Sequence, residues 1–266
     1  MPRAILYLPS CNLLHRFMLR ILNGTFLSMS TRLSVNVNKV ALIRNSRAGN
    51  LPDLVKVAQD CEAFGAEGIT VHPRPDERHI RYADIPKLRA VNTTEFNIEG
   101  NPTGQFLQLI AENPPTQATL VPDSPDVLTS DQGWDTIAHK DFLTEVTQRL
   151  HELGVRVSIF LDPVPRFVEG AKAIGTDRIE FYTGDYAKQY ASDPAAAVRP
   201  HIEAAKVAQE LGIGINAGHD LNLENLKYYA GQVEGLLEVS IGHALISDAL
   251  YFGLQNTIQL YLRQLK

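Results

Sequence analysis

The chain has 266 residues, of which 44% are hydrophobic and 21% are charged. This length and composition suit one globular domain with a substantial core, and single α/β barrels commonly have about 250 residues. The formal net charge of -5 excludes a general attraction to nucleic acid or to anionic membranes, so any anion site must be local. Two cysteines, Cys11 and Cys61, give no disulfide framework and predict a cytoplasmic location.

The N-terminal segment 1–31 differs in composition from the rest of the chain. Residues 1–26 contain three arginines and no acidic residue, and their apolar run is broken at Pro9. That run is too short to span a membrane and too early for the core of a secretory signal. Because Met29 directly precedes the first predicted strand, we expect 1–31 to be a disordered extension or a misassigned start, with a targeting peptide as the alternative. The remaining residues, 32–266, show no linker and predict a single domain.

From residue 32 onward, short β-rich segments alternate with segments of helical period. The predicted strands are 33–38, 68–72, 94–99, 118–121, 155–161, 178–182, 212–216 and 237–241. The predicted helices include 54–64, 142–153, 164–174, 201–211 and 245–265, and long loops are predicted at 43–52 and 122–134.

Four of the predicted helices are followed by a glycine and then by a strand, at Gly65, Gly154, Gly175 and Gly212. A glycine in the left-handed conformation ends a helix, and a repeated return from helix to strand indicates parallel strands joined by crossovers. Eight such units in one domain favour a closed barrel over an open sheet. The predicted fold class is therefore α/β, a (β/α)8 TIM barrel with additional helices.

Polar side chains stand at the carboxyl end of most predicted strands, where barrels of this class build their active sites. A single polar residue at a strand end is a hydrogen-bonded group at a loop hinge at least as often as it is catalytic. Convergence of such residues from so many strands, however, is typical of an active site. His72 can move protons in either direction near neutral pH, and Glu99 in apolar surroundings suits a general base. His219 is expected at the N-terminus of a helix that begins at Leu221, where it would act on a phosphorylated substrate.

The loop that follows the second predicted strand is rich in cations. It places Arg74, Arg78 and His79 close together, and two prolines stiffen its start. The acidic residues of the same loop can pair with Arg78, but they account less well for the presence of Arg74 and His79. We therefore predict that Arg74 and His79 bind a phosphate. Arg44 and Arg47 in the first long loop form a second cationic group. The sequence therefore predicts two phosphate sites.

Several other chemistries lack support in the sequence. There is no glycine-rich dinucleotide motif after a strand, no P-loop and no nucleophile elbow. A metal held by His72, Glu99 and His219 is conceivable, but no short metal-ligand motif is present, and we expect none.

The same positions carry a family resemblance. The matching stretches are 35–38 (VNVN), 44–47 (RNSR), 67–74 (EGITVHPR) with 78–80 (RHI), 97–99 (NIE), 120–122 (LVP), 216–219 (NAGH) and 241–244 (IGHA). With these motifs in order from residue 32 to the end, the chain resembles the pyridoxine 5′-phosphate synthase family, the ring-closing enzymes of the deoxyxylulose-dependent vitamin B6 pathway. The segment 1–31 has no counterpart.

The resemblance implies a (β/α)8 barrel with extra helices that assembles as a homo-octamer of dimers. It implies condensation of 3-amino-2-oxopropyl phosphate with 1-deoxy-D-xylulose 5-phosphate to give pyridoxine 5′-phosphate, phosphate and water. It also implies that no metal, nucleotide or bound pyridoxal phosphate is needed. The net charge argues separately against nucleic acid and membrane as partners. Alternatives are another phosphosugar barrel, either an aldolase or an isomerase, and a phosphate-ligand sensor without activity.

The resemblance also implies roles for individual residues. His72 and Glu99 would be proton acceptors, His219 the proton donor, and Glu180 would stabilise a charged transition state. The aminoketone phosphate would be held by Asn36, Arg47, Gly242 and His243, and the deoxyxylulose phosphate by Arg74, His79 and Thr129.

At two places the sequence departs from the family pattern. Asn38 and Lys39 replace a common Asp-His pair, and we predict that Lys39 contacts the sugar phosphate or its carbonyl while Asn38 contacts a hydroxyl. Asp220 replaces a glycine; we place it among the substrate-binding candidates, although capping of the following helix would also explain it.

Overall fold

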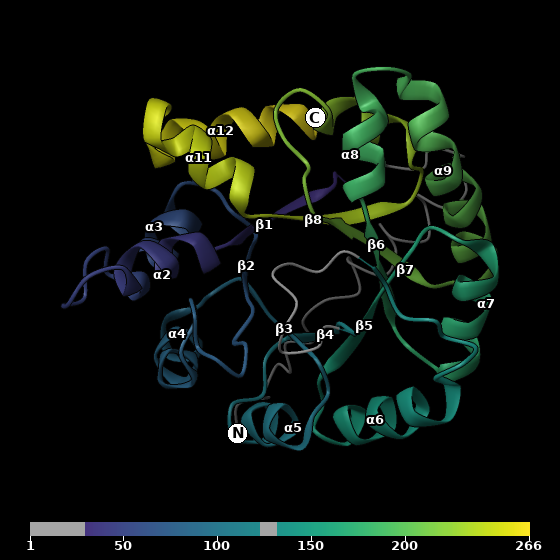
Figure 1. The fold of residues 1–266 in the computed structure, drawn as a ribbon, viewed down its shortest axis with the longest axis horizontal. Coiled ribbons are helices and arrows are strands. Elements are labelled where there is room, and N and C mark those ends of the chain that lie inside the picture. The colour runs from purple at the N-terminus through teal and green to yellow at the C-terminus, as the bar shows by residue number, and fades with distance from the viewer. Residues whose placement is uncertain (1–29, 123–131) are drawn as a thin grey trace, which may run out of the picture. The chain divides into compact units, whose positions relative to one another are not determined.

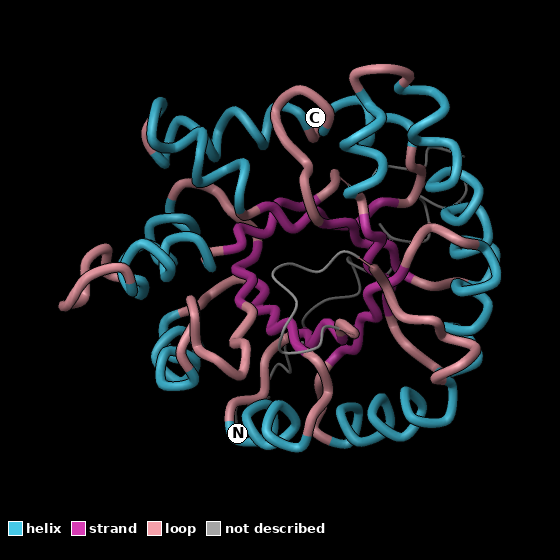
Figure 2. Tube along the Cα trace, viewed as in Figure 1, coloured by secondary structure: helices cyan, strands magenta, loops and turns pink. Residues whose placement is uncertain are grey.

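The computed structural model describes residues 30–122 and 132–266, so Cys11 and Thr129 lie outside the described residues. Eight parallel strands form a closed barrel in sequence order, with β1 paired to β8. Figure 2 shows the strands as a central ring surrounded by helices. The strands are β1 (Arg32–Asn36), β2 (Gly68–Val71), β3 (Glu95–Gly100), β4 (Gln117–Leu120), β5 (Arg156–Leu161), β6 (Arg178–Tyr182), β7 (Gly214–Gly218) and β8 (Leu236–Ile241). The predicted fold class is confirmed.

Helices pack around this barrel and connect successive strands (Figure 1). Those described are α2 (Asn38–Asn45), α3 (Leu54–Ala63), α4 (Ile85–Val91), α5 (Gly104–Glu112), α6 (Lys140–Glu152), α7 (Pro165–Ile174), α8 (Gly184–Tyr190), α9 (Pro194–Leu211), α10 (Leu226–Gln232), α11 (His243–Phe252) and α12 (Leu254–Gln264). The four glycines predicted to end helices all have positive φ, between 67° and 104°. Left-handed backbone therefore turns the chain from helix to strand at these points.

Two helical predictions were wrong in detail. The single helix predicted over 245–265 is interrupted at Gly253, which has a φ of 76° and separates α11 from α12. The helix expected from Leu221 begins only at Leu226. Side-chain oxygens of Asn222 and Asn225 accept backbone N–H bonds in the intervening segment, and such local bonds compete with helix formation.

The apolar core lies between the barrel and the helices, whereas the inside of the barrel is polar. Val35, Ile69 and Ile98 are buried on the outer side of their strands. Alternate residues point inward, and several of them bond between neighbouring strands: the Ser34 and Thr70 hydroxyls are 2.7 Å apart, and Thr119 Oγ1 donates to Asn97 Oδ1 at 2.9 Å. Ser158 and Asn216 are also buried on the inward side.

Ionic groups fill the amino-terminal end of the barrel. Glu95 pairs with Arg156 and lies 3.7 Å from Arg178, which is itself 3.9 Å from Glu238. Burial, followed by the charge of Glu95, raises the pKa of Glu238 to about 8. Functional groups at the other end therefore stand on a polar floor.

Cys61 lies in the core, and burial raises its thiol pKa to about 12. Within residues 30–122 and 132–266, no helix is long and apolar enough to cross a membrane.

Candidate active site

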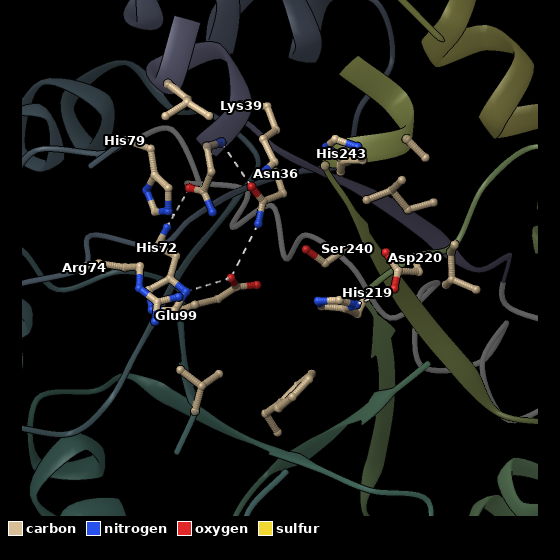
Figure 3. A pocket seen from close by; sticks show the side chains of 18 of the residues that line it. Asn36, Lys39, His72, Arg74, His79, Glu99, His219, Asp220, Ser240 and His243 are labelled. Atoms are coloured by element: carbon tan, nitrogen blue, oxygen red, sulfur yellow. Dashed lines mark hydrogen bonds and ion pairs between the residues drawn. The ribbon is translucent and has the colours of Figure 1, made fainter. Parts of the chain in front are cut away.

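A cavity of about 460 Å³ opens at the carboxyl ends of the strands (Figure 3). Side chains from β1, β3, β5, β6 and β8 and from the loops after β2 and β7 face it, so distant parts of the sequence converge on one space. The lining residues are Asn36, Asn38, Lys39, Leu42, His72, Arg74, Arg78, His79, Glu99, Val121, Phe160, Glu180, His219, Asp220, Leu221, Ser240, Ile241, Gly242, His243 and Ala244.

His72 and Glu99 form the centre of one side of the cavity. His72 Nδ1 lies 3.8 Å from Glu99 Oε2, and the same carboxylate oxygen accepts a bond of 3.4 Å from Asn36 Nδ2. The backbone N–H of His72 donates to Asn38 Oδ1 at 2.9 Å, and the Asn38 N–H donates to Asn36 Oδ1 at 3.1 Å. The start of α2 is thereby fastened to the end of β2, which fixes the position of the His72 ring.

His72 is neutral at physiological pH. Burial lowers its pKa well below the usual value, and the positive charge of Arg74 lowers it further. At 3.8 Å, the contact with Glu99 is therefore neither an ion pair nor a hydrogen bond. A neutral imidazole next to a carboxylate gives this side of the cavity two groups able to accept a proton.

The loop after β2 forms a basic wall next to these acceptors. Arg74 and His79 are buried and line the cavity together with Arg78 and with Lys39 from α2. Burial and the charge of Arg74 lower the pKa of His79 to about 4, and its Nδ1 accepts the backbone N–H of Ile80 at 2.9 Å. The ring proton of neutral His79 therefore resides on Nε2, which makes Nε2 a hydrogen-bond donor for an anion.

Arg44 does not belong to this wall, in contrast to the expectation from the sequence. It lies on α2, 2% exposed, and its two terminal nitrogens each bond an oxygen of Asp84 at 2.8 Å. Arg44 Nη2 also donates to the carbonyl oxygen of His79 at 3.1 Å, so its role is to position the loop. Arg47 is exposed beyond the end of α2 and does not line the cavity, so its contact with a substrate stays a prediction.

On the opposite side, Glu180 projects from β6. Its pKa is raised well above the usual value, first by burial and then by the charge of Glu99, which favours the protonated carboxyl group. A Cβ on Gly218 would lie 2.2 Å from Glu180 Oε1. The glycine at the end of β7 therefore makes room for this carboxyl group. Phe160 from β5 and Tyr182 from β6 form an edge-to-face pair with ring centroids 5.8 Å apart.

His219 and Asp220 follow β7 directly and have φ values of 86° and 56°. His219 Nδ1 is 2.9 Å from Asp220 Oδ2, and the His219 ring packs against that of Tyr182. Because α10 begins at Leu226, His219 does not stand at a helix N-terminus, and Asp220 does not cap a helix.

Gly242 and His243 instead join β8 to α11, a helix of 10 residues whose first turn begins at the cavity. A Cβ on Gly242 would approach Asn36 to 3.0–3.1 Å, so the glycine allows close packing of β8 against the end of β1. The exposed N–H groups of a helix start favour an anion, which agrees with a phosphate next to Gly242 and His243.

Sequence reasoning missed some residues that line the cavity, notably Ser240, Phe160 and Val121. Ser240 stands two residues before Gly242. Because side chains alternate along a strand, the sequence could have placed Ser240 on the cavity side of β8 together with Gly242. Thr129 lies outside the described residues. Among the residues described, no group of three or more His, Cys, Asp or Glu side chains is arranged to hold a metal ion.

Comparison with known proteins extends these observations. A family model described as "Pyridoxal phosphate biosynthesis protein PdxJ" matches residues 33–266. The chain belongs to the PdxJ family. It is therefore an enzyme of pyridoxine 5′-phosphate synthesis, as its similarity to curated members indicates.

The alignments with curated members of the PdxJ family span nearly the whole barrel. The pyridoxine 5′-phosphate synthase of Cytophaga hutchinsonii is 61% identical over 236 residues, which are 89% of this chain and 99% of the relative. The enzyme of the same name from Flavobacterium johnsoniae is 56% identical, over 89% of this chain and 100% of its own length.

Solved structures support the fold. The 3-keto-L-gulonate-6-phosphate decarboxylase of Vibrio cholerae has a TM-score of 0.61 at 12% identity, covering 89% of this chain and 97% of that protein. Orotidine 5′-monophosphate decarboxylase from Methanocaldococcus jannaschii has a TM-score of 0.59 at 10% identity, covering 89% and 99%. At such low identity the similarity concerns the barrel alone.

Proposed function

We propose that this chain condenses 3-amino-2-oxopropyl phosphate with 1-deoxy-D-xylulose 5-phosphate in the cavity described above, releasing pyridoxine 5′-phosphate, inorganic phosphate and water. The observation that carries the proposal is the convergence of His72, Glu99, Glu180 and His219 on one cavity with two anion-attracting walls. The amine of one substrate attacks the ketone of the other and water is lost. Loss of phosphate, aldol-type closure and loss of a second water then lead to the aromatic ring.

The two walls suit two phosphorylated substrates. The deoxyxylulose phosphate binds against the basic wall, where Arg74 and the Nε2–H of His79 donate to phosphate oxygens. The aminoketone phosphate binds at the start of α11, next to Gly242 and His243, with Asn36 at the end of β1. Arg47 and Thr129 remain proposed ligands of the aminoketone phosphate and of the sugar phosphate, respectively.

Proton transfers divide between the two sides of the cavity. Neutral His72 and the Glu99 carboxylate accept protons from carbon and nitrogen as the imine and enamine form. On the other side, His219 delivers a proton to a departing oxygen, and protonated Glu180 donates a hydrogen bond to negative charge in the transition state. Each positioned acid or base contributes a factor of about 10²–10⁴ to the rate.

Lys39 and Asn38 take part in holding the sugar. Lys39 lines the cavity close enough to His79 for its charge to lower the pKa of that ring, which places the ammonium group beside the phosphate wall. Asn38 uses its Oδ1 to accept the His72 N–H, which leaves its amide N–H groups for a sugar hydroxyl.

The test is to incubate the purified chain with both phosphates and to follow the absorbance of the pyridine ring, with mass spectrometry of the product. Each substrate alone is the control. Pyridoxine 5′-phosphate formed only with both substrates supports the proposal. Cleavage or isomerisation of the sugar phosphate without ring formation would assign the cavity to an aldolase or isomerase instead.

Self-association is part of the proposal. Leu250 and Tyr251 at the end of α11 are 75% and 87% exposed, and Leu42 and Ile43 on the adjoining α2 are also exposed. Exposed apolar side chains on two adjoining helices favour contact with a second copy. A homo-octamer, measurable by light scattering, and a cytoplasmic location remain predictions.

A further inference from the structure

The segment after β7 holds two consecutive non-glycine residues in the left-handed region, His219 and Asp220. Such a conformation is uncommon for one residue and needs support for two. The support comes from both sides: Thr183 Oγ1 donates to the His219 carbonyl, and Asn225 Nδ2 donates to the Asp220 carbonyl at 3.2 Å. The structure thus maintains an unfavourable backbone at the point where both side chains reach the cavity.

The two side chains bond each other, with 2.9 Å between His219 Nδ1 and Asp220 Oδ2. This bond is the main cause of a pKa of Asp220 below its usual value, against the opposing effect of burial. Asp220 is therefore an ionised acceptor at neutral pH, and the imidazole carries a proton on Nδ1. Nε2 is then the ring nitrogen that exchanges a proton with a substrate.

We infer that Asp220 is a positioning residue for His219. The carboxylate keeps Nδ1 protonated, fixes the orientation of the ring and stabilises the imidazolium, which transfers its Nε2 proton to a departing oxygen and becomes neutral. Asp220 stays ionised throughout and takes no proton. The inference rests on the proposed function in assigning the proton donor to His219, but the pairing itself can be tested without turnover.

A purely structural role does not account for the pair. The side chains are 25% and 46% exposed, and ion pairs so exposed contribute little to folding. The following turn is capped by other groups, because Asn222 Oδ1 accepts the N–H groups of Glu224 and Asn225. The carboxylate therefore acts chiefly on the imidazole.

Other ionisable groups also face this pair and enter the pH dependence. Glu180 and Tyr182 lie on β6, Lys188 on α8 and His243 on α11. The charges of His243 and Lys188 both favour an ionised Asp220. A change of Asp220 must therefore be compared with a change of charge elsewhere on this rim.

Two variants separate the effect of the Asp220 charge from that of its backbone conformation. Asp220→Asn keeps the shape and removes the charge, and Asp220→Gly removes the side chain while tolerating the φ of 56° without strain. The matched control is Asp185→Asn on α8, which removes a carboxylate that pairs with Lys188.

In both Asp220 variants, we expect the alkaline limb of the kcat profile to move to lower pH, because the negative charge that bonds the ring at Nδ1 is removed. On that limb kcat then falls about threefold, while KM for each phosphate stays within about twofold. Asp185→Asn should leave the limb in place. A limb unchanged in both Asp220 variants would overturn the inference.

Nitrogen-15 NMR of His219 provides a readout that needs no substrate. In the unsubstituted chain the proton of the neutral ring should reside on Nδ1, and in Asp220→Gly that preference should be lost. An unchanged tautomer in Asp220→Gly overturns the inference. If no pyridoxine phosphate forms at all, the proposed function fails, and the tautomer still shows whether Asp220 controls the ring.

Discussion

Asp84→Asn tests the buried ion pair that positions the phosphate-binding loop. Arg44 and Asp84 share two bonds of 2.8 Å, with side chains 2% and 11% exposed. Asp84 Oδ2 also accepts the N–H of Arg81 at 2.9 Å. Asparagine fits the same space but offers one acceptor oxygen, and its NH₂ group would face a donor on either side.

The expected cost follows from burial. Removing one charge of a buried pair leaves the other uncompensated and typically costs 3–5 kcal/mol, so we expect a loss of about 3 kcal/mol in the free energy of unfolding. The lower value is chosen because Arg44 retains bonds to Asn45 Oδ1 and to the His79 carbonyl, both at 3.1 Å. For a domain of this size the loss corresponds to a melting temperature lower by about 6–12 °C.

Urea denaturation measures this loss, and Asp60→Asn is the matched control. The Lys56–Asp60 pair has similar distances, 2.7 and 2.8 Å, but its side chains are 69% and 32% exposed. Its removal should cost about 0.5 kcal/mol or less. Equal losses in the two variants would refute the reasoning from burial. Because Arg44 also bonds the His79 carbonyl, KM for the sugar phosphate should rise in Asp84→Asn but stay unchanged in Asp60→Asn.

In Glu99→Gln, the affinity for each phosphorylated substrate, measured by calorimetry, should change by no more than about threefold, whereas kcat should fall by at least about 10²-fold because the amide cannot accept a proton. Unchanged turnover would remove Glu99 from the mechanism. Gly218→Ala should lower kcat with little change in melting temperature, since its Cβ would displace the Glu180 carboxyl group 2.2 Å away, and a fully active variant would contradict that geometry. Burial lowers the pKa of His201 to about 4, so the unfolded chain, titrating near 6.5, binds more protons between these values. The free energy of unfolding should fall as pH decreases through this window, and His201→Gln should reduce the fall measured by urea denaturation; an equal fall in both proteins would contradict the assignment.

The barrel was predictable because its signals are local. Period-two strands and the glycines after helices located all eight strands, and the predicted strand 178–182 has the same bounds as β6. The helix α2 was missed because the predicted strand 33–38 included its first residue and the predicted loop 43–52 included its last three, so that loop prediction was wrong at its start. The late start of α10 depends on which backbone groups Asn222 and Asn225 bond, and composition does not reveal that choice.

The site was predictable in its residues but not in their partners. Strand ends bring His72, Glu99 and His219 to one rim in any closed parallel barrel, so their convergence followed from the fold. Arg44 was assigned to a phosphate because its partner, Asp84, stands 40 residues away with no signal in the sequence. Tertiary contacts of this kind decide whether an arginine is structural or available to a ligand.

Differences in environment explain how one cavity can both accept and donate protons near neutral pH. Burial next to Arg74 keeps His72 neutral, although a solvated histidine would be partly charged. Burial near Glu99 favours the protonated form of Glu180, although a solvated glutamate would be ionised. Burial thus favours the uncharged form of both residues, but it makes one a base and the other an acid. A ring closure with several proton transfers needs both at once, and the polar floor of the barrel allows both to stand at the same rim.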